Sequence, residues 1–205
     1  MLFPPTCVNC GKVGKRWMCS KCALIMKKEL RLSTIKTTKY RIFFIGFYEG
    51  KLKKLLLEYK FNEKTYISNY FVEEIVNEKN IFHILREYDC IIPVPMYKLN
   101  KKNRGYNQSE IIAKKLAKKL HIEYIKNYLV KIKNNKKQSL LNKIERAQNV
   151  KNAYRIKDFE MIKNKRVILF DDIYTTGSTV NECLKQLRKA RPKLIDILVI
   201  AKTKL

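Results

Sequence analysis

Residues 167–179 have the sequence VILFDDIYTTGST. A run of apolar residues leads directly into two adjacent acids, Asp171 and Asp172, and five small residues follow at 175–179. The apolar run predicts a buried strand, and the residues after it predict a turn into a helix. The stretch therefore predicts a strand, turn and helix of an α/β protein, in which the strand delivers two carboxylates to its carboxyl end.

Strands and helices alternate on both sides of this unit. Apolar residues recur at helical spacing in several segments, as Ile112, Leu116 and Leu120 do in one of them. The expected strands are 39–50 with its turn, 89–95, 128–133, 166–172 and 195–203, and the expected helices are 23–32, 50–61, 66–79, 105–120 and 176–190. This alternation predicts a parallel sheet with flanking crossover helices.

Length and hydrophobicity fit one buried α/β domain with a small appendage. The chain has 205 residues, of which 46% are hydrophobic. No apolar run approaches the roughly 20 residues of a membrane helix. The start, MLFPPTCVNCG, lacks the charged and apolar regions of a signal peptide. We therefore expect a cytoplasmic protein, and association with the inner membrane is an additional expectation.

The charge of the chain is strongly positive. Lysine and arginine number 45 against 18 acidic residues, which gives a formal net charge of +27. Such a field attracts polyanions, with nucleic acid as the first candidate and anionic membrane as the second. Richness in lysine and asparagine is also what an AT-rich genome produces, so composition leaves both explanations open. The sequence carries no indication of the oligomeric state.

Four cysteines near the N-terminus form two CxxC pairs. The pattern CVNC-x8-CSKC places Cys7, Cys10, Cys19 and Cys22 at the spacing of two facing knuckles. Four thiolates in a tetrahedron favour a structural zinc ion, because no coordination position stays open for a substrate. Iron in a rubredoxin-like site and a redox dithiol are the alternatives. The isolated Cys90 and Cys183 lie in apolar patterns and are expected in the core.

The turn after the apolar strand has the composition of a phosphate site. Ligands of open α/β sheets bind at the carboxyl ends of the strands. Gly177 permits a tight turn, and Thr175, Thr176, Ser178 and Thr179 supply hydroxyl groups and backbone N–H groups at a helix N-terminus. Carboxylates accept hydrogen bonds from ribose hydroxyls. The stretch therefore indicates a sugar phosphate site.

Three other interpretations explain the stretch less well. A Walker B strand also ends in acids, but the chain has no GxxxxGK[ST] motif. A phospho-acceptor aspartate pocket does not require the small residues TTGST. An ordinary structural turn accounts for one capping serine or threonine, but not for both acids and the whole loop.

The thirteen residues resemble the phosphoribosyl pyrophosphate (PRPP) motif of type I phosphoribosyltransferases. The resemblance implies a type I phosphoribosyltransferase-like sheet in which Asp171 and Asp172 hold ribose hydroxyls and residues 175–179 hold the 5′-phosphate. It also implies Mg²⁺ bound together with PRPP.

A wider resemblance is carried by the cysteines and two further segments. IIPVPMYKLNKKNRGYNQSEIIAKKLA (91–117) and KKQSLLNKIERAQNVKNAY (136–154) are similar to blocks of the ComF family. These are competence-associated, phosphoribosyltransferase-like proteins of bacteria with a four-cysteine N-terminus. The chain carries lysine at several positions where the family usually has arginine. The resemblance implies a zinc-ribbon-like module at 1–32 and a phosphoribosyltransferase-like domain at 39–205.

The same resemblance suggests where pyrophosphate would bind, and the residue types around that region suggest where nucleic acid would bind. A loop after the strand at 89–95 is the expected pyrophosphate loop, with Lys98 and Arg104 as its contacts. The polar segment 134–154, expected to be irregular, corresponds to a mobile substrate loop. The candidates in it are Gln138, Arg146 and Asn149. The nucleic-acid candidates, which combine lysines that bind phosphate with tyrosines that stack on bases, are Lys101, Lys102, Tyr97 and Tyr106.

Three functions fit these features. The first is a competence factor for natural transformation that binds PRPP or a related ribose phosphate and single-stranded DNA during DNA uptake, in company with other DNA-uptake proteins. The second is an active phosphoribosyltransferase with an unidentified acceptor, for which the sequence shows no base-recognising hood. The third is a zinc-dependent interaction module that retains a degenerate pocket. No catalytic residue is assigned from the sequence.

Overall fold

The computed structural model describes residues 6–14, 17–30, 32–62, 64–134 and 143–204. Its centre is a six-stranded sheet with the order β1-β2-β8-β7-β3-β4. Strand β1 is antiparallel to β2, and the other neighbours are parallel. The strands are β1 (Ser33–Lys36), β2 (Arg41–Phe47), β3 (Cys90–Pro93), β4 (Glu123–Tyr124), β7 (Arg166–Tyr174) and β8 (Leu194–Lys202). The expected α/β class with a parallel sheet is confirmed.

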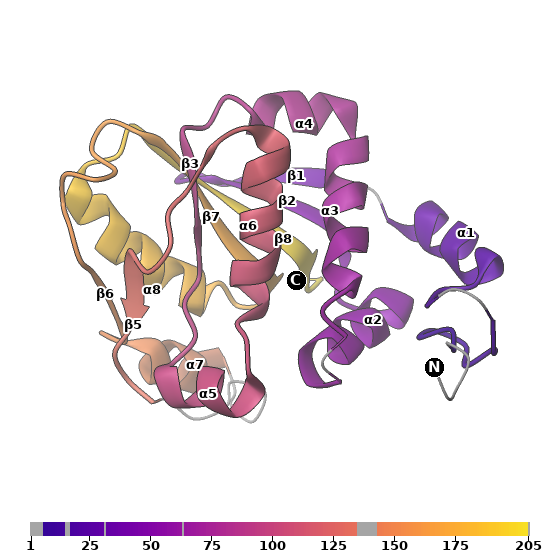
Figure 1. The fold of residues 1–205 in the computed structure, drawn as a ribbon. Helices are drawn as coiled ribbons and strands as arrows, with labels where there is room; N and C mark the ends of the chain where they lie inside the picture. Colours follow the sequence, from indigo (N-terminus) through magenta and orange to yellow (C-terminus); the bar gives the residue numbers. More distant parts are fainter. Residues whose placement is uncertain (1–5, 15–16, 31, 63, 135–142, 205) are drawn as a thin grey trace.

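Helices cover both faces of this sheet (Figure 1). On one face lie α2 (Gly50–Phe61), α3 (Ile67–Asn77) and α6 (Gln108–Leu120), whose apolar residues form one core cluster with Phe170 and Leu198. On the other face, α8 (Ser178–Leu187) packs in a second cluster with Leu169 and Val199. The short α4 (Lys79–Leu85) follows α3, and a 3-10 turn at Arg188–Ala190 follows α8. The molecule is thus a three-layer sandwich with the sheet in the middle.

The helical stripes expected from the sequence are confirmed as core. Ile112, Leu116 and Leu120 are buried on α6, and Val180, Cys183, Leu184 and Leu187 are buried on α8. Cys90 is buried on β3. Because both faces of the central strands are covered, β7 has a continuous buried apolar run at 167–170 and β8 has one at 197–201, as parallel strands have in this architecture.

Two segments expected to be irregular contain helices. Lys98–Arg104 is helix α5, which ends at Gly105 with φ at 81°, and not the loop that we expected. Lys143–Val150 is helix α7 within the segment 134–154. Both segments are rich in lysine, arginine and other good helix formers. Their polar composition is also typical of loops, which is why a loop was expected. Residues 135–142, with the candidate Gln138, lie outside the described part of the chain.

The expected strand at 128–133 joins a different sheet. Strand β5 (Leu129–Lys131) pairs antiparallel with β6 (Tyr154–Ile156), and together they form a two-stranded ribbon. Some boundaries also differ from the expected ones. Strand β7 continues past both acids to Tyr174, α6 begins three residues late behind the Asn107 cap, and α8 begins at Ser178.

The N-terminal cysteine module packs on α2 and α3. The Trp17 ring lies 5.7 Å from the ring centroids of both Tyr66 and Tyr70. The ammonium of Lys54 on α2 donates to the carbonyl of Asn9 at 2.6 Å. Helix α1 (Ser20–Glu29) buries Met26 against the same cluster as α2. The module therefore shares a core with the helices that reach the carboxyl edge of the sheet.

None of the helices that the structure describes is both long and apolar enough to cross a membrane.

Burial predicts how stability responds to substitutions in the sheet. Ile197 on β8 is fully buried, whereas Ile35 on the edge strand β1 is 36% exposed. Ile197→Ala should lower the free energy of unfolding by about 2–5 kcal/mol, because it removes buried methylene groups and leaves a cavity. The matched change Ile35→Ala should stay within about 0.5 kcal/mol. Urea unfolding followed by circular dichroism measures both, and equal losses would contradict the assigned core.

Candidate functional site

Two adjacent carboxylates stand at the carboxyl end of the central strand β7. The Ser109 hydroxyl, from the first turn of α6, donates to Asp171 Oδ1 at 3.2 Å. The backbone N–H of Asp172 donates to the same oxygen at 2.9 Å. Asp171 keeps some exposed surface, but protein surrounds it densely. Burial, with the neighbouring Asp172 charge, raises its pKa to about 7.

The second carboxylate pairs with a lysine from α2. Lys60 Nζ lies 2.7 Å from Asp172 Oδ2, and the two side chains are 20% and 13% exposed. The end of α2 is fastened to the start of α6, because the Tyr59 hydroxyl donates to the Gln108 carbonyl at 3.0 Å. In return the Gln108 side chain donates to the Lys60 carbonyl at 3.3 Å. The lysine is therefore held beside the acid by its helix.

The loop after the acids forms the N-terminus of α8. Gly177 is the residue before the helix and has φ at 74°, a left-handed conformation that favours glycine. A Cβ at this position would collide with the Tyr174 ring. The hydroxyls of Thr176 and Ser178 lie 2.8 Å apart, and the Thr203 hydroxyl donates to the Thr175 carbonyl at 3.3 Å. The loop is a small-residue cradle at a helix N-terminus, the arrangement that binds phosphate.

Two cavities meet at the acid pair. The first, named here the cradle cavity, has a volume of about 530 Å³ and is lined by Asp171, Asp172, most of the loop 175–179, Tyr48 and Lys53. The second, the β3 cavity, has a volume of about 270 Å³ and lies on the β3 side. The residues that line both cavities are Lys60, Asp171, Asp172 and Thr179. A ligand held by the acids can therefore extend in two directions.

The β3 cavity receives some of the expected pyrophosphate contacts. Arg104 lines it together with Asn100, Asn107 and Met96. The Arg104 guanidinium also donates to the Gln108 side-chain oxygen at 2.9 Å and stacks on the Phe61 ring. The lysines of α5 do not line either cavity. Lys98 and Lys102 are exposed, and neither is among the residues that line the two cavities. Lys101 Nζ pairs with Glu110 at 2.7 Å.

Sequence reasoning missed two residues of the β5–β6 ribbon that line the β3 cavity, Lys131 and Tyr154. They stand opposite each other in the ribbon, and Lys131 Nζ lies 5.8 Å from the Tyr154 ring centroid. Burial lowers the pKa of Lys131, and the charge of Asp171 opposes this shift. The two residues are more than twenty positions apart in the chain, so no local sequence pattern connects them. Only the pairing of β5 with β6 brings them together.

The remaining candidates lie near the site without a role that the geometry assigns. Tyr97 immediately precedes α5, and its carbonyl accepts from the Lys101 N–H. The Tyr106 hydroxyl donates to the Tyr59 carbonyl, and its ring packs against the core. Asn149 and Arg146 are on α7, at the same end of the sheet as α5 (Figure 1). The Arg146 side chain lies outside the described atoms.

The four N-terminal cysteines converge on one point. Their sulfur atoms all lie within 4.8 Å of one another. The first knuckle turns at Gly11, with φ at 76°, whose N–H donates to the Cys7 carbonyl at 2.8 Å. The second knuckle leads into α1 and contributes Cys22 from its first turn. Four close thiols can bind a metal ion, as the spacing predicted.

The electrostatics of this cluster favour a cation. Although burial opposes it, hydrogen bonds from backbone N–H groups lower the pKa of Cys7 to about 6. Burial, hydrogen bonds that the Cys22 thiol donates to the other cysteines, and the Cys7 charge raise the pKa of Cys22 to about 12. The lowered pKa of Cys7 favours a thiolate there, and binding of a metal ion to the sulfurs would release further thiol protons.

Comparison with known proteins identifies the domain that carries the acid pair. The family described as "Phosphoribosyl transferase domain" matches residues 107–204. "Competence protein F" of Haemophilus influenzae is 30% identical over 97% of this chain and 85% of that protein. "Competence protein ComFC" of Streptococcus pneumoniae is 28% identical over 91% of this chain and 76% of that protein. "DNA utilization protein YhgH" of Escherichia coli K12 is 24% identical over 80% and 72%.

Solved structures show more distant similarity. A purine phosphoribosyltransferase from Pyrococcus horikoshii matches with a TM-score of 0.40 and 19% identity, over 66% of this chain and 84% of that chain. An orotate phosphoribosyltransferase from Aeropyrum pernix matches with a TM-score of 0.38 and 15% identity, over 88% and 79%. Similarity at this level carries no functional conclusion.

The raised pKa of Asp171 predicts a pH-dependent stability. In the unfolded chain the pKa of this carboxyl is near its ordinary value of 3.8, and in the folded chain it is about 7. Between these values the folded protein holds the extra proton, so the contribution of Asp171 to stability falls as pH rises through this window. Asp171→Asn removes the titration. Its melting temperature relative to the parent protein should therefore rise from pH 4 to pH 8, and a constant difference would contradict the shift.

Proposed function

Because the chain belongs to the ComF family of competence-associated, phosphoribosyltransferase-like proteins, we propose that it acts in DNA uptake during natural transformation by binding PRPP or a related ribose phosphate. The observation that carries the proposal is the acid pair between two cavities, one of which contains the phosphate cradle. The carboxylates accept hydrogen bonds from the ribose hydroxyls, and the N–H and hydroxyl groups of residues 175–179 hold the 5′-phosphate.

The pyrophosphate arm of the ligand fits the β3 cavity. Arg104, Lys131 and Lys60 line it, so three cationic side chains face a group that carries several negative charges. Mg²⁺ bound to the pyrophosphate oxygens would neutralise part of the same charge. Gln138, Arg146 and Asn149 are the proposed loop contacts of the pyrophosphate. Lys98 is a further proposed cation at the periphery of the same region.

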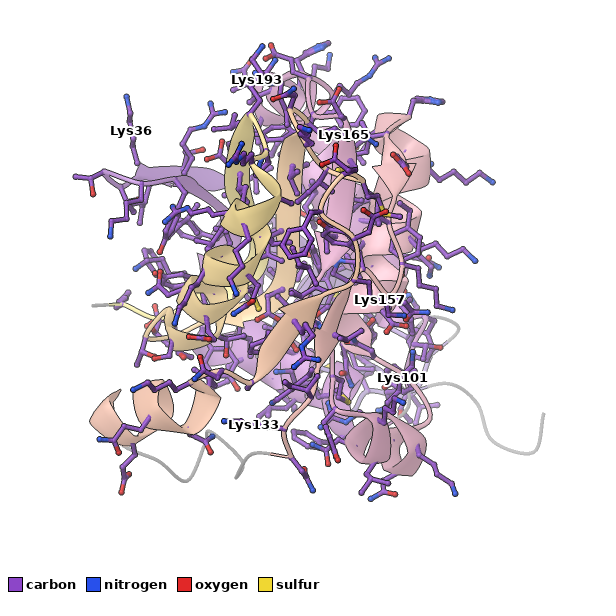
Figure 2. The ribbon with its side chains drawn as sticks, turned by 90° about the vertical axis from the view of Figure 1, so that its left-hand side faces the viewer. Lys36, Lys101, Lys133, Lys157, Lys165 and Lys193 are labelled. Carbon is purple, nitrogen blue, oxygen red and sulfur yellow. The ribbon has the colours of Figure 1, made fainter. Side chains whose placement is uncertain are left out.

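Single-stranded DNA is the proposed second partner. The net charge of +27 supplies the electrostatic attraction, and the labelled lysines project from several sides of the molecule (Figure 2). Because the cations are spread over many elements, association should depend on salt more than on sequence. Lys101, Lys102, Tyr97 and Tyr106 remain the proposed contacts near α5.

A second candidate function is phosphoribosyl transfer to an acceptor. The two cavities on either side of the acid pair favour it, because a displacement at C1′ needs space for both the entering and the leaving group. Tyr48 and Lys53 line the side away from the β3 cavity, where the acceptor would lie. Release of pyrophosphate on incubation with PRPP and candidate bases identifies this function.

PRPP binding is tested by calorimetry with the Asp171→Asn, Asp172→Asn double variant. We expect PRPP affinity to fall at least about 100-fold, because two acceptors of the ribose hydroxyls lose their charge. Asp158→Asn, at an exposed position outside both cavities, is the matched control and should bind as the parent does. Unchanged PRPP affinity in the double variant would overturn the proposal.

Binding of single-stranded DNA is measured on the same variants by fluorescence anisotropy over a series of salt concentrations. Both variants should retain it, with an affinity that falls steeply as salt increases. If the parent protein does not bind DNA at low salt, single-stranded DNA is rejected as a partner, whatever the result with PRPP.

We propose structural zinc in the four-cysteine cluster. The purified protein should contain roughly one zinc ion per chain, since four sulfur ligands leave no open position. Cys7→Ser with Cys10→Ser should abolish the metal content measured by mass spectrometry and lower the melting temperature, because the module packs on α2 and α3. Iron with a thiolate absorption band would identify the rubredoxin-like alternative.

A further inference from the structure

Lys60 stands at the junction of the two cavities without belonging to the sequence motif. It comes from the last turn of α2, outside the residues 107–204 that match the phosphoribosyl transferase domain. It lines both cavities, and its ammonium lies 2.7 Å from Asp172 Oδ2. In the structure it therefore occupies one of the acceptors that the ribose hydroxyls need.

The backbone of Lys60 is held in this place. Its carbonyl accepts from the Gln108 side chain, and the preceding Tyr59 is tied at both ends, through its hydroxyl to the Gln108 carbonyl and through its own carbonyl to the Tyr106 hydroxyl. The helix end cannot withdraw without breaking these bonds. When a ligand takes Asp172, the ammonium must find another anion within reach of a fixed backbone.

Ribose 5-phosphate and PRPP share the ribose and the 5′-phosphate, but they leave the Lys60 ammonium with different partners. Ribose 5-phosphate competes with Lys60 for Asp172 and brings no anion into the β3 cavity to replace it. The Lys60 side chain is only 20% exposed, so weakening its ion pair is unfavourable. PRPP places a pyrophosphate in the β3 cavity, which Lys60 already lines. The ammonium then exchanges a carboxylate for a phosphate oxygen, and the charge stays compensated.

We propose that Lys60 is a specificity-determining residue that makes this site select a pyrophosphorylated ribose over ribose 5-phosphate. When such a ligand binds, the Lys60 ammonium exchanges Asp172 for a pyrophosphate oxygen. The inference rests on the proposed function and adds to it the basis of selection. Arg104 and Lys131 also line the β3 cavity, but their attraction for pyrophosphate does not depend on the ribose hydroxyls. Lys60 links the two halves of the ligand, because one ammonium serves both acceptors.

The test is the ratio of two dissociation constants, for PRPP and for ribose 5-phosphate, measured by calorimetry on the full chain at one fixed Mg²⁺ concentration. The parent protein should prefer PRPP. Lys60→Met should reduce this preference at least tenfold by weakening PRPP binding, while ribose 5-phosphate binds as well as before or more tightly. Lys60→Gln keeps a hydrogen-bond donor and should show the same loss, and Lys60→Arg should retain most of the preference.

Lys64→Met is the matched control. Lys64 lies just beyond the same helix and forms a comparable ion pair with Glu58 at 2.6 Å, with side chains 32% and 21% exposed. It is absent from the residues that line the two cavities. This variant should leave the ratio unchanged, which separates loss of an ion pair from loss of this particular one.

The outcomes distinguish the inference from the proposed function. If the parent protein binds PRPP and the folded Lys60→Met and Lys60→Gln variants keep its preference, the inference is wrong and the proposed function stands. If both affinities fall by the same factor, Lys60 supports the site only structurally, and the inference is also wrong. If the parent protein binds neither ligand, the proposed function is rejected and the inference is rejected with it.

Discussion

The organisation of this molecule depends on the placement of two adjacent carboxylates at the end of a buried central strand. Like charges in neighbouring positions repel each other, and burial makes each of them costly. Compensation comes from different elements. Ser109 at the start of α6 donates to Asp171, and Lys60 at the end of α2 pairs with Asp172. The two helices are joined to each other around Gln108, so the acids and their partners form one connected unit.

This unit extends to the N-terminal module. Helix α2 carries Lys54, which binds the backbone of the first cysteine knuckle, six residues before Lys60, which pairs with Asp172. Trp17 of the module packs against Tyr66 and Tyr70 around the start of α3. Helix α2 therefore gives a physical connection between the cysteine module and the acid pair.

Part of this site could be predicted from the sequence, because its signals are local. The stretch 167–179 placed both acids and the cradle, since an apolar run, two carboxylates and a glycine with small hydroxyl residues leave few other arrangements. The cysteine spacing placed four sulfurs together for the same reason. The α5 and α7 helices were missed because their polar composition resembled that of loops, although the individual residues favour helices.

The amino-acid sequence by itself determined the α/β class, the buried strands, the small-residue cradle at the start of α8 and the cysteine cluster, because each follows from residues close together in the chain. The tertiary structure decided which distant residues complete the site. Lys60, Ser109 and the pair Lys131 and Tyr154 come from four separate elements, and they meet the acids only after the sheet order and the β5–β6 ribbon are formed. Electrostatic compensation acts through space, so its partners are set by packing and not by spacing in the sequence.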